Sequence, residues 1–367
     1  MYGVSTLLAF LQNYSGLWCH DVAVNVSARE MLVGTTRVHR SRVYRTRPIR
    51  AAILCTILGM ATILVGNPSL AIPLVVGAFF AGLCDTAEPV GDHWRSMTWT
   101  TMWLTVGTVL GGLSSNIGYF ELFTVAGFAF CCGIAGVVGQ RGALNGMLAL
   151  VMFSIFAGTP ARGHSIAIDG LFVALGGAIH LIVVVAASFI VDRSKLHSNA
   201  GPTSSFWVRL RSGFSRPHHF LRHGLRLALA MVIATALSDV LEWPHEYWIP
   251  MTVAWVSRPD FTGTTTRIIE RFAGTVLGIA AALLFIDGFA LHDYWLCVVA
   301  GAGVGLCLAF VRANYSISVI GVTLVIISLF ALQGESVGET LAYRLAATTL
   351  ACVIAALASV IWMRSAA

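Results

Sequence analysis

Aromatic, acidic and basic side chains occur together in one stretch of an otherwise apolar chain. The members of this stretch are Tyr247, Trp248, Pro250, Trp255, Arg258, Asp260, Arg267 and Arg271. Arg267 and Arg271 are four residues apart, so they would share one face of a helix. Guanidinium groups bind carboxylates through paired hydrogen bonds, and aromatic rings contact the apolar part of a ligand. The stretch predicts a binding site for an amphipathic organic anion, but anchoring of the arginines to lipid phosphates, with Asp260 and Glu270 as their partners, explains it equally well.

Two further polar residues lie within long apolar stretches. Arg344 falls in the outer half of the last one. A charge within a membrane helix costs about 2.5–3.5 kcal/mol or more, so it should face a partner or water. We expect Arg344 either to balance charge on a transport path or to pair with Glu339. His180 fits a neutral, hydrogen-bonded core histidine, and a proton relay is its functional alternative.

The composition predicts which elements position these residues. Apolar residues make up 57% and charged residues 11% of the 367 residues, whereas soluble proteins have roughly 25% charged residues. A soluble core could not bury so much apolar surface. Membrane-spanning strands alternate in polarity, and these stretches do not. The predicted fold class is therefore an all-α polytopic membrane protein.

Twelve transmembrane helices are expected, because a span needs about 20 mostly apolar residues. They are 49–66, 69–84, 98–117, 119–138, 142–160, 167–191, 224–242, 246–258, 271–289, 293–311, 314–332 and 337–363. Arginines gather before the first span and around a basic linker. Cytoplasmic loops are enriched in Lys and Arg, so both termini are predicted to be cytoplasmic.

Short matches in the same order predict an internal duplication. Gly107-Thr108-Val109-Leu110-Gly111 recurs as Gly274-Thr275-Val276-Leu277-Gly278, and Ile72-Pro73 recurs as Ile249-Pro250. The predicted domains are an N-terminal cytoplasmic segment at 1–48, six-helix repeats at 49–191 and 223–367, and a cytoplasmic linker at 192–222. An even number of spans makes the repeats parallel. Pro73 and Pro250 lie in short second spans, and prolines that interrupt matching spans indicate a transport path.

The second half, at about 222–363, resembles the fusaric-acid-resistance (FUSC) family of bacterial membrane proteins, which includes aromatic acid exporters. The resemblance rests on Tyr247-Trp248-Ile249-Pro250, Arg258-Pro259-Asp260-Phe261, Arg267, Arg271 and Gly274-Thr275-Val276-Leu277-Gly278. The first half lacks the Arg-Pro-Asp-Phe segment. Many family members carry a large cytoplasmic domain where this chain has only the linker. The resemblance implies the bacterial inner (plasma) membrane and export of aromatic or other organic acids and toxic compounds, driven by the proton gradient. A distant similarity to plant aluminium-activated malate transporters implies one path between the halves.

We therefore expect an efflux transporter for organic anions and not an enzyme. Arg258, Asp260, Arg267 and Arg271 would act at the cytoplasmic mouth, and the aromatic residues would contact the ligand. The expected partners are a small organic anion and membrane lipids, and a homo-oligomer is compatible with the sequence. We expect no cofactor, metal or nucleic acid. A passive organic-anion channel and a non-transporting membrane scaffold are the alternatives.

Overall fold

The computed structural model describes residues 43, 45–85, 93–115, 117–158, 163–191, 208, 211 and 217–363. Most of the predicted N-terminal segment 1–48 and of the basic linker 192–222 lies outside the described residues, and the end of that linker, 217–222, is helical. Their roles, and the domain boundaries drawn from them, therefore stay predictions.

The described part of the chain contains twelve α-helices. They are α3 (Thr46–Leu64), α4 (Ala71–Asp85), α5 (His93–Ser114), α6 (Glu121–Ile134), α7 (Gln140–Ala157), α8 (Gly163–Val191), α10 (Pro217–Leu241), α11 (Trp248–Val256), α12 (Phe261–Ala282), α13 (Tyr294–Phe310), α14 (Tyr315–Ala331) and α15 (Val337–Met363). Each overlaps one predicted apolar stretch, so the all-helical fold class is confirmed.

Eight helices within the described residues are long and apolar enough to cross a membrane. These are α3, α7, α8, α10, α12 and α15, together with α4 and the 3-10 turn before it (Pro68–Asp85) and α6 and the 3-10 turn after it (Glu121–Val138). The apolar helices α13 and α14 have 17 residues each. The protein is therefore a multi-pass membrane protein, and twelve complete spans stay a prediction.

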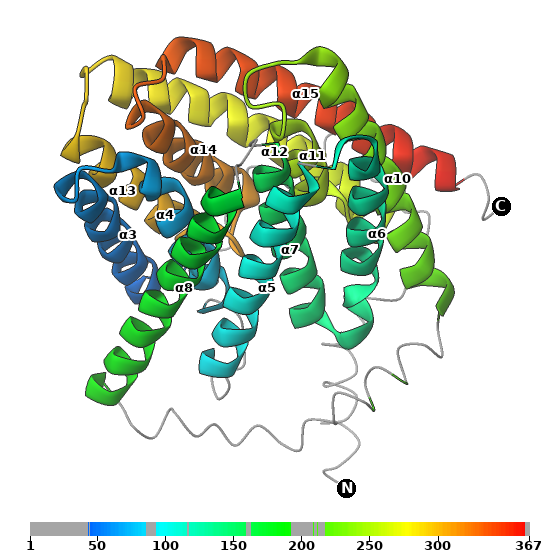
Figure 1. The fold of residues 1–367 in the computed structure, drawn as a ribbon, viewed down its shortest axis with the longest axis horizontal. Coiled ribbons are helices and arrows are strands. Elements are labelled where there is room, and N and C mark those ends of the chain that lie inside the picture. Colours follow the sequence, from blue (N-terminus) through cyan, green and yellow to red (C-terminus); the bar gives the residue numbers. More distant parts are fainter. Residues whose placement is uncertain are drawn as a thin grey trace, which may run out of the picture.

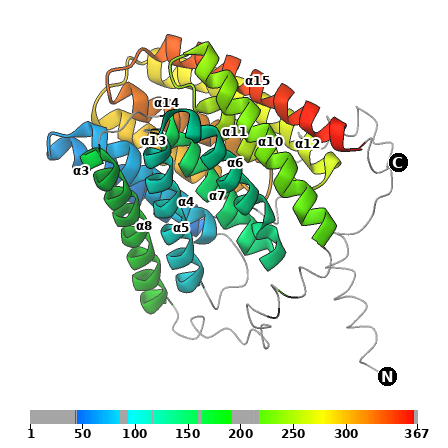
Figure 2. The same cartoon turned by 45° about the vertical axis from the view of Figure 1, so that its right-hand side comes forward.

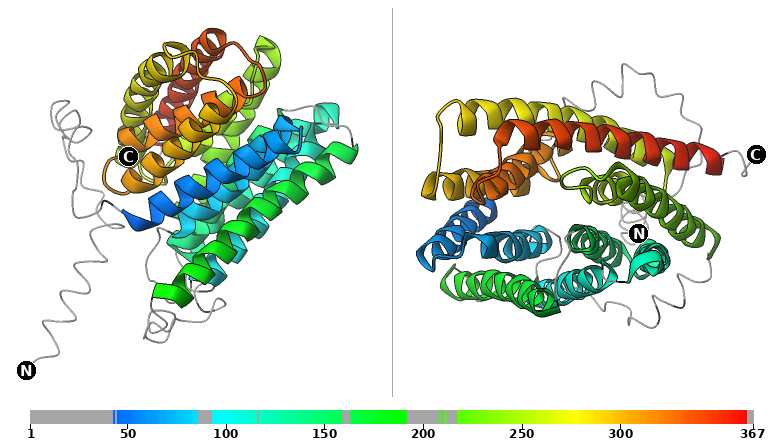
Figure 3. Two further views of the ribbon diagram at one scale, coloured as in Figure 1. Left: turned by 90° about the vertical axis from the view of Figure 1, so that its left-hand side faces the viewer. Right: turned by 45° about the horizontal axis from the view of Figure 1, so that its top comes forward.

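The two halves of the chain form two layers (Figure 3). Helices α3 to α8 make one layer, and α10 to α15 make the other. Helix α12 shows how these layers suit lipid, because it exposes Phe272 and Leu277 and buries Thr264, Gly274 and Thr275. Helices that pack together in a membrane place small and hydroxyl-bearing residues at their contacts and large apolar residues toward the lipid.

The same helix pairs occur in both layers. The third helix of each half, α5 or α12, packs against the fifth, α7 or α14. The second, α4 or α11, packs against the sixth, α8 or α15. Between the layers, α3 packs on α13 and α10 packs on α6 (Figures 1 and 2), so the first helix of each half contacts the fourth helix of the other.

The repeated glycine motif makes the same contact in each layer. A Cβ atom on Gly107 would overlap the backbone carbonyl oxygen of Ala149 on α7. A Cβ atom on Gly274 would likewise overlap the carbonyl oxygen of Ser316 on α14. Each motif therefore brings two helices of its layer into close backbone contact.

Helices α4 and α11 lie inside the molecule, where Trp255 of α11 meets Phe80 of α4 edge-on at 6.0 Å. Helix α11 has nine residues, all buried, and at about 14 Å it is too short to cross a bilayer alone. The prediction that Pro73 and Pro250 interrupt these helices is wrong, because each is the third residue of its helix. Backbone N–H groups of the first turn have no partner within a helix, so proline there removes no hydrogen bond.

Candidate functional site

A cavity of about 160 Å³, which we call the outer cavity, lies at the N-terminal end of α11. Its lining consists of Ser115, Glu121, Val125, Phe153, Ser154, Ala157, Gly158, Met231, Thr235, Ser238, Asp239, Glu246, Tyr247 and Pro250. Helices α6 and α7 come from one layer, and α10 and α11 come from the other. The outer cavity therefore lies on the seam between the halves, at the end of the bundle predicted to face outward.

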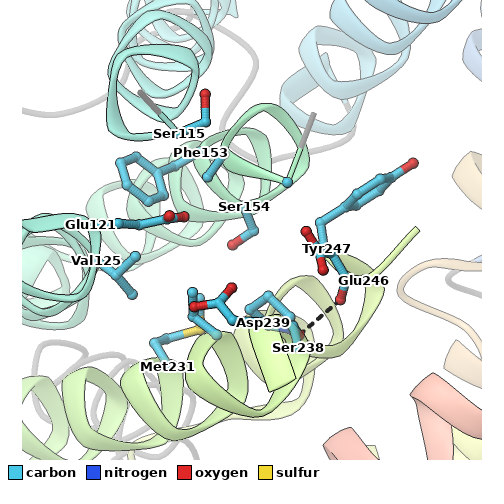
Figure 4. Close-up of a pocket in the computed structure, with 14 residues that line it drawn as sticks. Ser115, Glu121, Val125, Phe153, Ser154, Met231, Ser238, Asp239, Glu246 and Tyr247 are labelled. Atoms are coloured by element: carbon cyan, nitrogen blue, oxygen red, sulfur yellow. Dashed lines mark hydrogen bonds between the residues drawn. The ribbon is translucent and has the colours of Figure 1, made fainter. Parts of the chain in front are cut away.

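Three carboxyl groups line the outer cavity, from Glu121, Asp239 and Glu246. Figure 4 shows Glu121 and Asp239 directed into it from α6 and α10, with the Ser154 hydroxyl nearby. Burial, followed by the negative charges of Asp239 and Glu242, raises the pKa of Glu246. The outer cavity is thus acidic, and Glu246 keeps its proton to a higher pH than a free glutamic acid.

A second cavity of about 40 Å³, the inner cavity, lies at the other end of α11. It is lined by Cys132, Gly133, Gly136, Ala143, Met147, Leu150, Phe220, His223, Leu227, Ala254, Ser257, Arg258 and Pro259. Burial, followed by the positive charge of Arg267, lowers the pKa of Arg258 to about 10. Arg258 therefore remains charged at neutral pH, and the inner cavity carries the opposite charge to the outer one.

Only about one helical turn separates the two cavities. On α11, Pro250 lines the outer cavity and Ala254 lines the inner one. On α10, the corresponding pair is Met231 and Leu227. Four residues of helix correspond to about 6 Å, so a short apolar barrier closes the seam at the level of α11.

The ends of α4 and α11 are held by arginines from the first helix of each half. Arg50 pairs with the carboxylate of Asp85 at the end of α4. Arg226 donates a hydrogen bond to the backbone carbonyl oxygen of Arg258, just after α11. Asp260 begins the next helix, where its carboxylate accepts a hydrogen bond of 2.6 Å from the backbone N–H of Gly263. Asp260 is exposed, and through this hydrogen bond it caps the N-terminus of α12.

Arg267, Arg271 and Arg344 are not part of either cavity lining. The guanidinium carbon of Arg267 lies 3.8 Å from the ring centre of Tyr315, and that of Arg344 lies 5.1 Å from the ring centre of Trp248. Arg271 and Arg344 are both 0% exposed. Helix α12 therefore turns Arg271 into the second layer, away from both cavities, and its role at a cytoplasmic mouth stays a prediction.

The alternative ion pair between Glu339 and Arg344 is wrong. All three guanidinium nitrogens of Arg344 lack a hydrogen-bond partner among the described residues, and Glu339 is exposed. Glu335 instead pairs with His245 at 2.7 Å. His245 stacks on Trp248 with ring centres 4.6 Å apart, so Trp248 lies between this surface pair and Arg344.

The first layer holds the remaining predicted residues. His180 is fully buried, and its Nδ1–H donates a hydrogen bond of 2.6 Å to the carbonyl oxygen of Ala78 on α4. Its Nε2 has no partner among the described residues. This geometry agrees with a neutral core histidine, and the proton relay stays a prediction. Pro73 is buried in α4 and lines neither cavity.

The sequence analysis missed the three carboxylates of the outer cavity. Each lies at or next to a helix end: Glu121 starts α6, Asp239 is near the end of α10, and Glu246 precedes α11. In antiparallel neighbours these positions fall at the same end of the bundle. The shared position of these carboxylates at one end of the bundle could have pointed to the site. Using it would have required knowing that α6 and α10 are neighbours.

One family model matches part of the second half of the chain. Residues 230–358 match the family described as "Fusaric acid resistance protein-like", which confirms the resemblance predicted from sequence. No solved structure matches this chain significantly.

Relatives that match part of the chain occur in several bacteria. The inner membrane protein YccS of Escherichia coli is 30% identical over 160 residues, 43% of this chain and 22% of YccS. The uncharacterized transporter YdhK of Salmonella typhimurium is 34% identical over 87 residues, 23% of this chain and 13% of YdhK. The Synechocystis protein slr1298 is 33% identical over 135 residues, 36% of this chain and 17% of that protein. This chain therefore spans less than a quarter of the length of each.

Proposed function

We propose that this multi-pass membrane protein, whose second half is a member of the FUSC-like family, exports organic anions along the seam between its two layers. The observation that carries the proposal is the pair of cavities at the two ends of α11. A relative named as a transporter supports the general class. The substrate proposed is an aromatic or other amphipathic organic acid, as the family resemblance implies.

The halves act in this proposal as two parallel repeats around an axis along the membrane normal. The recurring helix pairs and the reciprocal contacts of α3 with α13 and α10 with α6 support it. The proposed setting is a bacterial inner membrane with both termini cytoplasmic, in line with the relative named as an inner membrane protein.

Proton coupling is proposed at the outer cavity. A departing anion would be repelled by ionised Glu121, Asp239 and Glu246. Protons taken up from the outside remove that repulsion, so proton entry and anion exit favour one another. Arg258 at the inner cavity attracts the anion before it enters the seam.

A flux assay in liposomes tests the proposal with the purified protein and labelled benzoate. We expect benzoate flux that rises when the outside is acidified. Ala254→Phe fills the inner cavity and should lower the flux at least about tenfold, since access to the seam is blocked. The matched control is Ala280→Phe on the exposed face of α12, which should keep the flux of the wild type.

Three outcomes would count against the proposal. Flux equal to that of empty liposomes would favour a non-transporting scaffold. Flux that ignores the pH gradient would favour a passive channel. Equal loss in the Ala254→Phe and Ala280→Phe variants would show that the seam is not the route.

A further inference from the structure

A second polar region lies inside the second layer, away from the seam. It consists of Arg271 and Thr275 of α12, Tyr315 and Ser316 of α14, and Arg344 and Thr348 of α15, and we call it the buried donor cluster. Each of these side chains has a buried nitrogen or oxygen atom without a hydrogen-bond partner among the described residues. Helix α12 packs on both α14 and α15 (Figure 1). Buried polar groups almost always have partners, so a concentration of such donors indicates a ligand.

The two arginines make the cluster strongly positive. Arg271 and Arg344 are 0% exposed, and they lie on α12 and α15, which pack together. Nε and Nη2 of Arg271, and Nε, Nη1 and Nη2 of Arg344, lack partners among the described residues. Buried charges in proteins are paired or bind an ion of opposite charge. Two neighbouring guanidinium groups call for an anion between them.

Helix geometry extends the cluster by one turn on each side. Thr275 follows Arg271 by four residues, and Thr348 follows Arg344 by four, so each hydroxyl shares a helix face with its arginine. Both threonines are 0% exposed. An anion held by the guanidinium N–H groups would therefore have hydroxyl donors from two helices within the same layer.

The nearby aromatic faces are already occupied. Arg344 lies over the ring of Trp248, and Arg267 lies over the ring of Tyr315. A ligand ring would have to displace these cation–π contacts, whereas several guanidinium N–H groups have no hydrogen-bond partner among the described residues. The cluster therefore suits a compact ligand with several oxygen atoms better than an aromatic acid.

We propose that the buried donor cluster binds a compact divalent oxyanion, at a site separate from the two cavities of the seam. A charge of −2 would balance Arg271 and Arg344. Inorganic sulfate or hydrogenphosphate and a small dicarboxylate share this chemistry. The inference goes beyond the proposed export of organic acids and does not depend on it.

Calorimetry and thermal unfolding of the purified full chain in detergent test this site. Sodium sulfate, sodium phosphate and sodium succinate are compared with sodium benzoate and sodium chloride at equal ionic strength. We expect the divalent anions to bind and raise the unfolding temperature more than the monovalent ones. Sulfate or phosphate binding more tightly than succinate would identify an inorganic ligand, and the reverse order would identify a dicarboxylate.

Variants locate the binding. Arg344→Gln and Thr348→Val should each raise the Kd for the preferred anion at least about tenfold. Arg222→Gln removes a charge from an exposed position on α10 and should leave the Kd unchanged. Thr275→Val and Thr348→Val keep the charge and nearly the volume, so they decide the matter if Arg344→Gln fails to fold.

The inference is overturned if benzoate and chloride act as strongly as the divalent anions, or if the threonine variants bind like the wild type. The seam proposal is judged separately by benzoate flux. Benzoate flux without binding of a divalent anion would contradict only the buried anion site. Binding of a divalent anion without benzoate flux would contradict only the transport proposal.

Discussion

Asp260 illustrates, at the scale of one residue, how a charge near a membrane surface can serve the fold. Its carboxylate accepts the 2.6 Å hydrogen bond from the Gly263 N–H at the start of α12. Loss of such a cap costs about 1 kcal/mol. We therefore expect Asp260→Ala to lower the free energy of unfolding by about that amount, measured by chemical unfolding in detergent, whereas Asp260→Asn, which still accepts the bond, changes it by only a few tenths. Loss of benzoate flux in a stable Asn variant would instead assign Asp260 to the ligand.

Glu246 leads to a pH prediction at the same scale. Burial and the neighbouring acids raise its pKa in the folded protein above the usual 4.5. The folded state then binds a proton at a pH where the unfolded state has already lost it. This residue therefore makes the protein more stable as the pH falls toward the ordinary pKa of 4.5 and less stable as the pH rises through the raised pKa. Melting temperatures across this range should show that slope, and Glu246→Gln should flatten it. If the melting temperature of the Glu246→Gln variant kept the same slope with pH, other titratable groups would be its cause.

The arginines show what residue types alone could and could not reveal. The sequence singled out Arg271 and Arg344 because charges are rare in apolar stretches. It could not show that they belong to one cluster, because Arg271 and Arg344 lie on helices that are far apart along the chain. Nor could it separate Arg271 from Arg258, since only the break between α11 and α12 sends one side chain inward and leaves the other at the seam.

At the scale of the element, the twelve helices followed from apolar stretches and their order. The apolar stretches did not reveal how long α4 and α11 are, or where in these helices the prolines lie. A helix start depends on the loop before it, and His245, with φ of +57°, turns the chain so that α11 begins only two residues before Pro250. Pro250 therefore falls in a first turn and not within a helix.

Glycine contacts give a prediction for elements. A Cβ on Gly274 would overlap the Ser316 carbonyl oxygen of α14, whereas a Cβ on Gly127 would meet nothing within 4 Å. We expect Gly274→Ala to lower the free energy of unfolding by about 1–3 kcal/mol, as overpacking does. Gly127→Ala should be neutral or gain up to about 1 kcal/mol of helix propensity. Thermal unfolding in detergent measures the stability of both variants. Equal stability would show that the α12–α14 contact relaxes to accommodate the added methyl group.

At the scale of the whole molecule, the seam was predictable and its charge was not. Six spans in each half and a family resemblance indicated a path between halves. The acidic outer cavity depends on the packing of α10 against α6, a contact between the halves that no local pattern records. Of the two described cavities, only the inner one is lined by an arginine, Arg258.

The closed seam leads to the last prediction. Cavities of about 160 and 40 Å³ are smaller than the roughly 300 Å³ that a ligand pocket needs, so export requires the layers to move apart. The contact of α3 with α13 is one place to lock them, because a Cβ on Gly59 would lie 3.0 Å from the Sγ of Cys297 and 3.3 Å from its Cβ. Disulfides join Cβ atoms about 3.5–4.5 Å apart, so a small shift admits the bond.

We therefore expect oxidised Gly59→Cys to form a disulfide with Cys297, detected by mass spectrometry of its peptides. Benzoate flux should then fall at least about tenfold and return on reduction, as for a transporter whose cycle needs domain motion. Gly338→Cys, placed where a Cβ meets nothing within 4 Å, should respond to neither treatment. If the disulfide forms completely and flux continues, the layers do not separate at α3 and α13, and the opening of the seam has to come from α11 and its loops alone.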